Sequence, residues 1–210
     1  LRLRSKSKTA LVELAEHVRI AWSGYSDEAN GVVAFTGDTP HNAITPIARR
    51  RGEAQGGCIS MKKVLLLGDS IRMGYQGEVK KLLEGEYEVM FPEDNGRFAA
   101  YTLWQVNQAF KHHPDIALVH FNNGYWDMNV ESPMTEAIHP VAEYQSFLRR
   151  IVALCHACGA KVVFATTVPI MEAGAADDNT GTAGRINYSN EWVKTYNAAA
   201  LEVMGEMGVV

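Results

Sequence analysis

The strongest hydrophobic pattern in the chain is an uninterrupted apolar run, residues 64–67, between two lysines and Gly68. A run of this length that ends in a glycine turn is typical of a strand buried on both faces of a parallel sheet. A helix is expected from about Arg72, which places Ser70 at the carboxyl end of the strand. Ligands bind at this end of open α/β sheets, where free N–H groups of the next helix favour negative charge. Ser70 is therefore a candidate nucleophile, and a turn serine that caps the helix is the alternative.

Helix and strand patterns alternate from Met61 onward. Apolar residues at helical spacing predict helices over residues 74–84, 101–111, 141–158 and 190–207. Short apolar runs predict further strands over residues 87–91, 115–121 and 161–166, and Gly208 is interpreted as the entry to a fifth strand. The alternation predicts an α/β fold in which helices cover both faces of a parallel sheet.

The first 60 residues lack this regularity. Residues 9–22 have the spacing of one amphipathic helix, but glycines and polar residues interrupt residues 24–57. We therefore predict a poorly ordered N-terminal extension over residues 1–60 and a folded domain over residues 61–210. Because Met61 directly precedes the first convincing strand, one hypothesis is that residues 1–60 are translated upstream sequence. A genuine flexible extension is the alternative.

Composition narrows the class of protein. The chain has 210 residues, 47% of them hydrophobic, which is enough for one sizeable core. The net charge of −4 argues against a nucleic-acid partner. No segment approaches the roughly 18 consecutive apolar residues that span a membrane, so a cytoplasmic protein without a membrane partner is predicted.

The cysteines agree with a reducing compartment, because Cys58, Cys155 and Cys158 do not form a disulfide framework. The spacing of Cys155 and Cys158 resembles a metal or redox pair. No second such pair lies nearby in the sequence, so ordinary packing at a helix end is favoured and no metal is expected.

A nucleotide-binding loop is a competing interpretation of the turn after residues 64–67. Gly68 and Gly74 do not form the Gly-x-Gly-x-x-Gly pattern, and no Lys-Ser or Lys-Thr pair closes a phosphate loop. A nucleotide-binding α/β domain is therefore kept as a minor alternative.

Three short motifs follow predicted strands: Gly68-Asp69-Ser70, Asn95-Gly96-Arg97-Phe98 and His120-Phe121-Asn122-Asn123-Gly124. In this order the sequence resembles the SGNH (GDSL-type) hydrolases, in particular a branch whose third motif reads His-Phe-Asn-Asn-Gly. The resemblance covers residues 61–210 and none of residues 1–60. It implies a three-layer α/β/α fold with a flavodoxin-like sheet of parallel strands.

The resemblance also implies the roles of three residues. Ser70 would be the nucleophile, and the N–H of Gly96 and the side-chain amide of Asn123 would stabilise the oxyanion together with the N–H of Ser70. Phe121 and Gly124 depart from the commoner form of the third motif, which leaves Asn122 as an alternative to Asn123. Residues beside the motifs could line a substrate pocket or serve only as helix-start and loop residues: Asp69, Arg72, Arg97, Asn122, Trp126 and Asp127.

The family takes its general base from an Asp-x-x-His motif beyond the fifth strand, and Val210 precedes any such motif. Among the histidines present, His139 is a weak substitute. We therefore expect an incomplete hydrolase domain without its last strand and helix, with little activity of its own. The open edge of the strand over residues 161–166 would then favour self-association.

The resemblance implies a serine ester hydrolase that removes a small acyl group, such as an acetyl group on a carbohydrate. The expected partner is a small-molecule ester, for example an acylated sugar, and no metal or organic cofactor is expected. A non-catalytic binding fragment or pseudo-enzyme is the main alternative.

Overall fold

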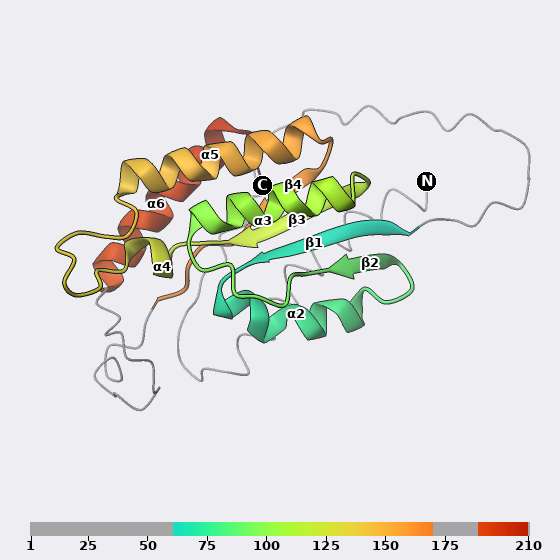
Figure 1. Ribbon diagram of the computed structural model, residues 1–210, viewed down its shortest axis with the longest axis horizontal. Coiled ribbons are helices and arrows are strands. Elements are labelled where there is room, and N and C mark those ends of the chain that lie inside the picture. The colour runs from blue at the N-terminus through green and yellow to red at the C-terminus, as the bar shows by residue number, and fades with distance from the viewer. Residues whose placement is uncertain (1–60, 170–188, 210) are drawn as a thin grey trace, which may run out of the picture.

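The computed structural model describes residues 61–169 and 189–209 (Figure 1). The predicted N-terminal extension, residues 1–60, lies outside the described residues. The described part contains one sheet of four parallel strands in the order β2-β1-β3-β4. The strands are β1 (Lys62–Gly68), β2 (Tyr87–Met90), β3 (Ile116–Asn122) and β4 (Lys161–Phe164). This order confirms the predicted flavodoxin-like sheet.

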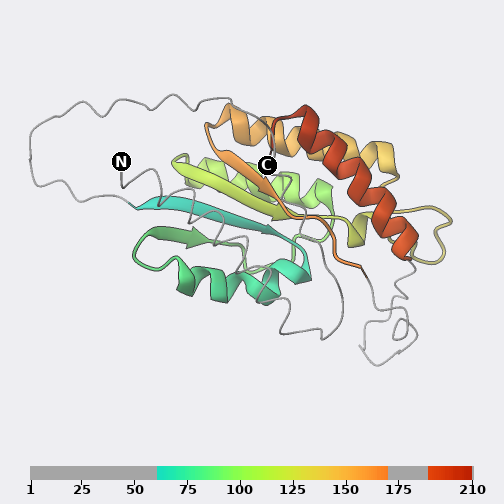
Figure 2. The same ribbon diagram turned by 180° about the vertical axis from the view of Figure 1, so that it is seen from behind.

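Helices cover both faces of the sheet (Figures 1 and 2). One face carries α2, and the other carries α3 and α5, with α6 beside α5. Side chains of β1 alternate between the two layers: Val64 and Leu66 pack with α2, whereas Leu65 and Leu67 belong to the larger core beneath α3 and α5. All four are almost completely buried, which explains the unbroken apolar run. The helices are α2 (Ser70–Leu82), α3 (Ala99–His112), α4 (Tyr125–Met128), α5 (Val141–Ala157) and α6 (Asn190–Glu206).

Several predicted boundaries shift by a few residues. Helix α2 begins at Ser70, two residues before the expected start, because Asp69 caps it through its side chain. The short helix α4 was not predicted. The expected fifth strand is not present at Val209, whose N–H donates to the carbonyl of Met204 at 2.9 Å and so closes the end of α6. Val210 lies outside the described residues.

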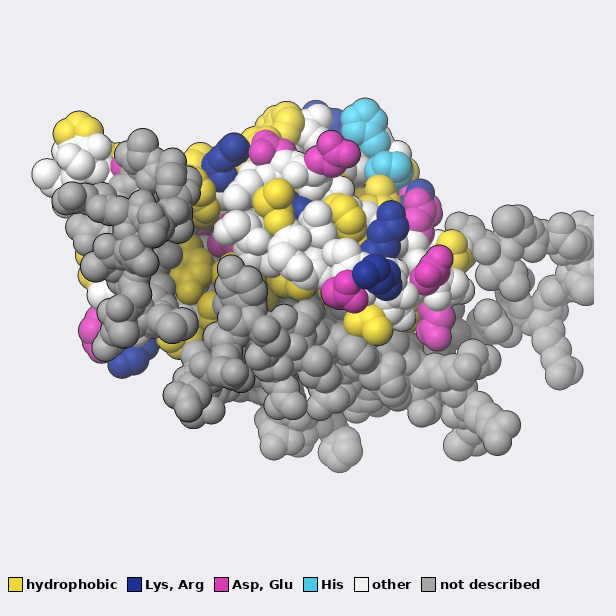
Figure 3. Space-filling model, turned by 90° about the horizontal axis from the view of Figure 1, so that it is seen from below, with side chains coloured by type: hydrophobic (Ala, Val, Ile, Leu, Met, Phe, Trp, Pro, Cys, Tyr) yellow, Lys and Arg dark blue, Asp and Glu magenta, His cyan; other side chains and the backbone are white. Residues whose placement is uncertain are grey.

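Strand β4 pairs with β3 on one side and has no strand partner on the other among the described residues. The expected self-association through this edge stays a prediction. On the α2 side of the molecule, acidic and basic side chains of the described residues are mixed (Figure 3). Among the described helices, none combines the length and apolar character that a membrane crossing requires.

The two cysteines of α5 and its C-terminal cap have different environments. Cys155 is buried in the core, and burial raises the pKa of its thiol to about 12. Cys158 is exposed. No group of three or more metal-binding side chains occurs in the part of the chain that the structure describes. Cys155 is thus a packing residue.

Candidate active site

Ser70 is the first residue of α2 and directly follows the turn after β1, at the carboxyl edge of the sheet. Its side chain is exposed, and its hydroxyl has no hydrogen-bond partner among the described residues. The turn depends on Gly68, whose φ of +138° is rarely adopted by other residues. A Cβ atom on Gly68 would lie 2.1 Å from Oδ1 of Asn122. Asp69, and not Ser70, is the N-cap residue of α2, so the alternative interpretation of Ser70 as the helix cap does not hold.

Asp69 is buried and ties the serine turn to the end of β3. Its Oδ1 accepts hydrogen bonds from the N–H of Ile71 and from Nδ2 of Asn122, both at 2.9 Å. Burial raises the pKa of the Asp69 carboxyl to about 6, although both hydrogen bonds favour its ionised form. Asp69 and Asn122 are 1% and 3% exposed, and their hydrogen bonds support the serine turn.

The raised pKa of Asp69 predicts a pH-dependent stability. The folded protein holds the Asp69 proton more tightly than the unfolded chain does, so this contribution to stability is present at low pH and is lost as the pH rises through about 6. At about 1.4 kcal/mol per pKa unit the loss is roughly 3 kcal/mol. Asp69→Asn keeps an acceptor oxygen and cannot titrate. Urea unfolding between pH 4 and pH 8 should show a weaker fall in stability for this variant than for the wild type.

Asp115→Asn is the matched control for this experiment, because Asp115 is exposed and pairs with Lys63 at the surface. This variant should retain the fall in stability between pH 4 and pH 6. Equal pH profiles for the wild type and Asp69→Asn would show that Asp69 titrates normally in the folded protein.

Arg72 was expected beside a substrate pocket, but it is completely buried in α2. Its guanidinium donates to the carbonyls of Pro92 at 2.8 Å and Asp94 at 2.6 Å. These bonds fix the segment after β2 against the serine turn. Because backbone carbonyls occupy its guanidinium away from solvent, the structure favours the alternative that Arg72 is a helix-start residue.

Gly96 reaches the serine turn, as the motif order predicts. Its N–H donates to the carbonyl of Gly68 at 2.8 Å, and a Cβ atom at Gly96 would lie 2.5 Å from that oxygen. Only glycine allows this close approach. An oxyanion role for Gly96 stays a prediction. In that role the Gly96 N–H would have to donate to the oxyanion in place of, or in addition to, the Gly68 carbonyl. The next residue, Arg97, has φ +46° and donates its N–H to Oδ1 of Asn95 at 2.8 Å.

Asn123 directly follows β3 and is completely buried. Its Nδ2 donates to the carbonyl of Arg97 at 3.1 Å, and its own carbonyl accepts from the hydroxyl of Tyr144 at 2.9 Å. A side-chain amide carries two N–H donors, so this bond leaves a second donor. Because Gly68 and Asn122 are paired in the β1–β3 register, the Ser70 and Asn123 segments emerge from adjacent strands.

Asp127 and His139 form a buried pair that the sequence analysis did not identify. Nδ1 of His139 lies 2.7 Å from Oδ1 of Asp127, and the same oxygen accepts from the N–H of Ala99 at 2.9 Å. Burial raises the pKa of the Asp127 carboxyl. Through these hydrogen bonds Asp127 joins α4 to the start of α3 and to the segment before α5. Trp126 is half-buried beside it.

No described histidine is hydrogen-bonded to Ser70. His139 is held by Asp127, and its ring also contacts Phe98 edge-on at 5.3 Å between ring centroids. His120 lies in β3, where burial lowers the pKa of its imidazole to about 4 and keeps it neutral. His139, the weak substitute base, is bonded to Asp127 through Nδ1 and is not hydrogen-bonded to Ser70.

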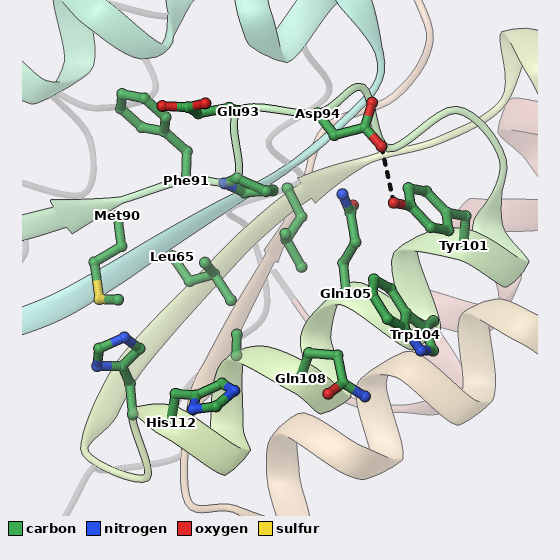
Figure 4. Close-up of a pocket in the computed structure, with 14 residues that line it drawn as sticks. Leu65, Met90, Phe91, Glu93, Asp94, Tyr101, Trp104, Gln105, Gln108 and His112 are labelled. Carbon is green, nitrogen blue, oxygen red and sulfur yellow. Dashed lines mark hydrogen bonds between the residues drawn. The ribbon is translucent and has the colours of Figure 1, made fainter.

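A groove of about 430 Å³ opens between α3 and the segment that follows β2 (Figure 4). Its floor is formed by β1 and β2, and one rim carries Asp94, which leads directly into the Asn95-Gly96 turn. The lining residues are Leu65, Leu67, Met90, Phe91, Pro92, Glu93, Asp94, Tyr101, Trp104, Gln105, Gln108, Ala109, His112 and His113. The sequence analysis did not predict it, because its residues come from three separate elements.

Solved structures with a similar fold are esterases and related hydrolases. A GDSL-like lipase from Bacteroides thetaiotaomicron matches with a TM-score of 0.53 and 16% identity, over 70% of this chain and 66% of the lipase. A provisionally assigned acylhydrolase from Bacteroides fragilis matches with a TM-score of 0.54 and 20% identity, over 70% of this chain and 65% of the acylhydrolase. A mutant of the esterase AlinE4 matches with a TM-score of 0.51 and 11% identity, over 73% of this chain and 76% of the esterase. The domain therefore has the SGNH hydrolase fold.

A different protein matches a short stretch of the sequence. Galactose-1-phosphate uridylyltransferase from Streptococcus mutans is 59% identical over 51 residues, and that from Bacillus subtilis is 53% identical over 53 residues. The matched stretches make up 24% and 25% of this chain. They cover only 10% of the length of either uridylyltransferase. No protein-family model matches the chain.

Proposed function

We propose that the described domain is a serine ester hydrolase of the SGNH type, with Ser70 as its nucleophile. The observation that carries this proposal is the position of the Ser70 hydroxyl: exposed, without a described partner, and at the N-terminus of α2 on the carboxyl edge of the sheet. The segments of Gly96 and Asn123 reach the same edge. This is where open α/β sheets bind their ligands.

In the proposed reaction, Oγ of Ser70 attacks the carbonyl carbon of the ester while a base removes the hydroxyl proton. The C–O bond to the alcohol then breaks, the alcohol takes up the proton, and an acyl-serine remains. Water attacks the acyl-serine, which releases the acid and restores the serine. None of the described histidines bonds Ser70, so the base is proposed to come from outside the described residues.

Asn123 is the best-supported donor for the oxyanion of this reaction. Its amide is buried and held by the carbonyl of Arg97, so its second N–H has a fixed direction. The N–H groups at the start of α2 lie in the same turn as the nucleophile. Preorganised donors of this kind stabilise the charge that develops on the carbonyl oxygen.

Replacing Asn123 tests the proposed oxyanion site. In the full-length protein, Asn123→Ala should lower kcat/KM for 4-nitrophenyl acetate by about 100- to 1,000-fold, because one fixed donor is lost. Asn122→Ala is the comparison, since Asn122 bonds Asp69 and not the proposed oxyanion. A clearly larger loss for Asn122→Ala would move the role to that residue.

The proposed substrate is a small acyl ester, for example an acetyl group on a sugar. A non-catalytic binding domain is the second candidate, and the observation in its favour is that no described histidine reaches Ser70. Ester turnover that depends on Ser70 would exclude this second candidate. A nucleotide-binding role lacks a phosphate-loop motif in the sequence.

We also propose that the uridylyltransferase-like stretch lies within residues 1–60. The likeness to hydrolase structures covers about 70% of the chain, and the described domain begins at Met61. A stretch from another enzyme ahead of Met61 would support the hypothesis of translated upstream sequence. Because the matched stretch covers only 10% of the uridylyltransferase, no transferase activity is assigned to this chain.

A further inference from the structure

The groove beside α3 combines features that bind a flat, hydroxylated ligand. Its aromatic wall consists of Tyr101 and Trp104, whose rings stack with an angle of 9° and 5.5 Å between centroids (Figure 4). Arg97 lies over the Tyr101 ring at 5.7 Å. The side chain of Trp104 is 54% exposed, so the indole offers a large apolar surface at the rim of the groove.

Gln105 is the polar group inside this groove. It is only 6% exposed, yet its amide has no hydrogen bond to any described residue, and its Oε1 is completely shielded from solvent. Figure 4 shows the amide extending from α3 toward the segment of Asp94. A buried amide without partners is unfavourable unless a ligand or water completes its hydrogen bonds.

The acidic rim supplies a second polar contact. The carboxylate of Asp94 accepts from the hydroxyl of Tyr101 at 2.8 Å, and this bond lowers its pKa, so it stays ionised at neutral pH. Gln108 lies on the next turn of α3 and also lines the groove. A ligand in the groove would thus meet amides and a carboxylate on one side and aromatic carbon on the other.

Hydrogen bonds link the segment at the Asp94 end of the groove to the serine turn. The carbonyl of Asp94 accepts from Arg72 at 2.6 Å, and the N–H of Gly96 donates to Gly68 at 2.8 Å. These bonds hold the rim of the groove against the residues that precede Ser70. The Asp94 end is therefore the end of the groove that is tied to the serine turn.

We propose that this groove binds a sugar ring of the substrate, with Trp104 packed against the ring carbons and with Nε2 of Gln105 and the carboxylate of Asp94 hydrogen-bonded to hydroxyls. The inference rests on the proposed ester hydrolase function and names its substrate class, an acylated saccharide. An aliphatic acyl chain fits the apolar floor but would leave the buried amide of Gln105 without partners. A sugar ring satisfies both parts of the groove.

Binding of unacylated sugars tests the subsite without any need for catalysis. The probes are the methyl β-glycosides of glucose, galactose, xylose and N-acetylglucosamine and their β-1,4-linked disaccharides, measured by calorimetry and ligand-detected NMR. At least one probe should bind the wild type. Trp104→Ala and Gln105→Leu should each weaken that binding by tenfold or more.

Two control variants separate the possible causes. Trp192→Ala removes an exposed tryptophan of α6 away from the groove and should leave binding unchanged. Ser70→Ala should also bind the sugar normally, because the subsite does not include Ser70. Sugar binding by a wild-type protein that does not hydrolyse esters would contradict only the proposed function. Gln105→Leu should not lower the melting temperature, because its amide makes no hydrogen bond within the described residues.

Three results would overturn the sugar subsite. The first is the absence of binding by every saccharide probe, even in a protein that hydrolyses simple esters. The second is saccharide binding that survives both Trp104→Ala and Gln105→Leu. The third is binding of decanoate in the groove that persists in Gln105→Leu, which would identify the groove as an acyl-chain site.

Discussion

Replacing Ser70 with alanine is expected to reduce ester turnover by the full-length protein by up to roughly a millionfold, the size of loss seen when a serine nucleophile is removed. Without Oγ no acyl-serine forms, and the remaining catalysis comes from binding and oxyanion donors alone. The fold should be unaffected, because Asp69 caps α2 and the Ser70 hydroxyl has no described partner. Initial rates with 4-nitrophenyl acetate and the melting temperature measure the two effects.

Ser146→Ala is the matched control for Ser70→Ala, since Ser146 is an exposed serine on α5. This variant should keep full turnover and the same melting temperature. Turnover that survives in Ser70→Ala would remove the serine from the reaction and favour a binding role for the domain.

Asp127→Ala is expected to cause the largest loss of stability. Asp127 is completely buried, and its Oδ1 holds both Nδ1 of His139 and the N–H of Ala99. Each buried donor left without its acceptor costs about 1–3 kcal/mol, and Asp127→Ala leaves two such donors, so a loss of about 4 kcal/mol is expected. For a chain of this size that corresponds to a fall in melting temperature of about 10 °C.

Asp115→Ala provides the contrast for this prediction. Asp115 pairs with Lys63 at the surface, where a salt bridge contributes about 0–1 kcal/mol. Thermal unfolding of both variants at pH 7 measures the difference. If Asp127→Ala unfolded at the same temperature as Asp115→Ala, the buried pair would not hold α3 to the segment before α5.

The parallel sheet was predictable because its strands depend on local patterns, whereas the order of the strands was expected only from the family resemblance. The run of residues 64–67 is apolar since β1 is covered on both faces, and each motif follows a strand, so a parallel sheet brings all three to one edge. The closeness of Gly96 to Gly68 and of Asn122 to Asp69 follows from this order.

The long-range polar contacts were not predictable from the sequence. Arg72 has the position of an exposed residue in a first helical turn, and only the fold shows that the carbonyls of Pro92 and Asp94 surround it. The Asp127–His139 pair joins α4 to a segment without a periodic pattern. Patterns of hydrophobicity report burial of apolar faces, and they contain no signal for which polar groups meet.

The most direct test of the central proposal is covalent labelling of the full-length protein by a serine-directed fluorophosphonate, followed by peptide mass spectrometry. A single adduct on Ser70 is predicted, absent from Ser70→Ala and retained in Ser146→Ala, because an activated serine attacks the phosphorus, displaces fluoride as its proton passes to a base, and keeps the phosphonyl group. An unlabelled Ser70, or labelling that continues in Ser70→Ala, would contradict the assignment of Ser70 as the nucleophile.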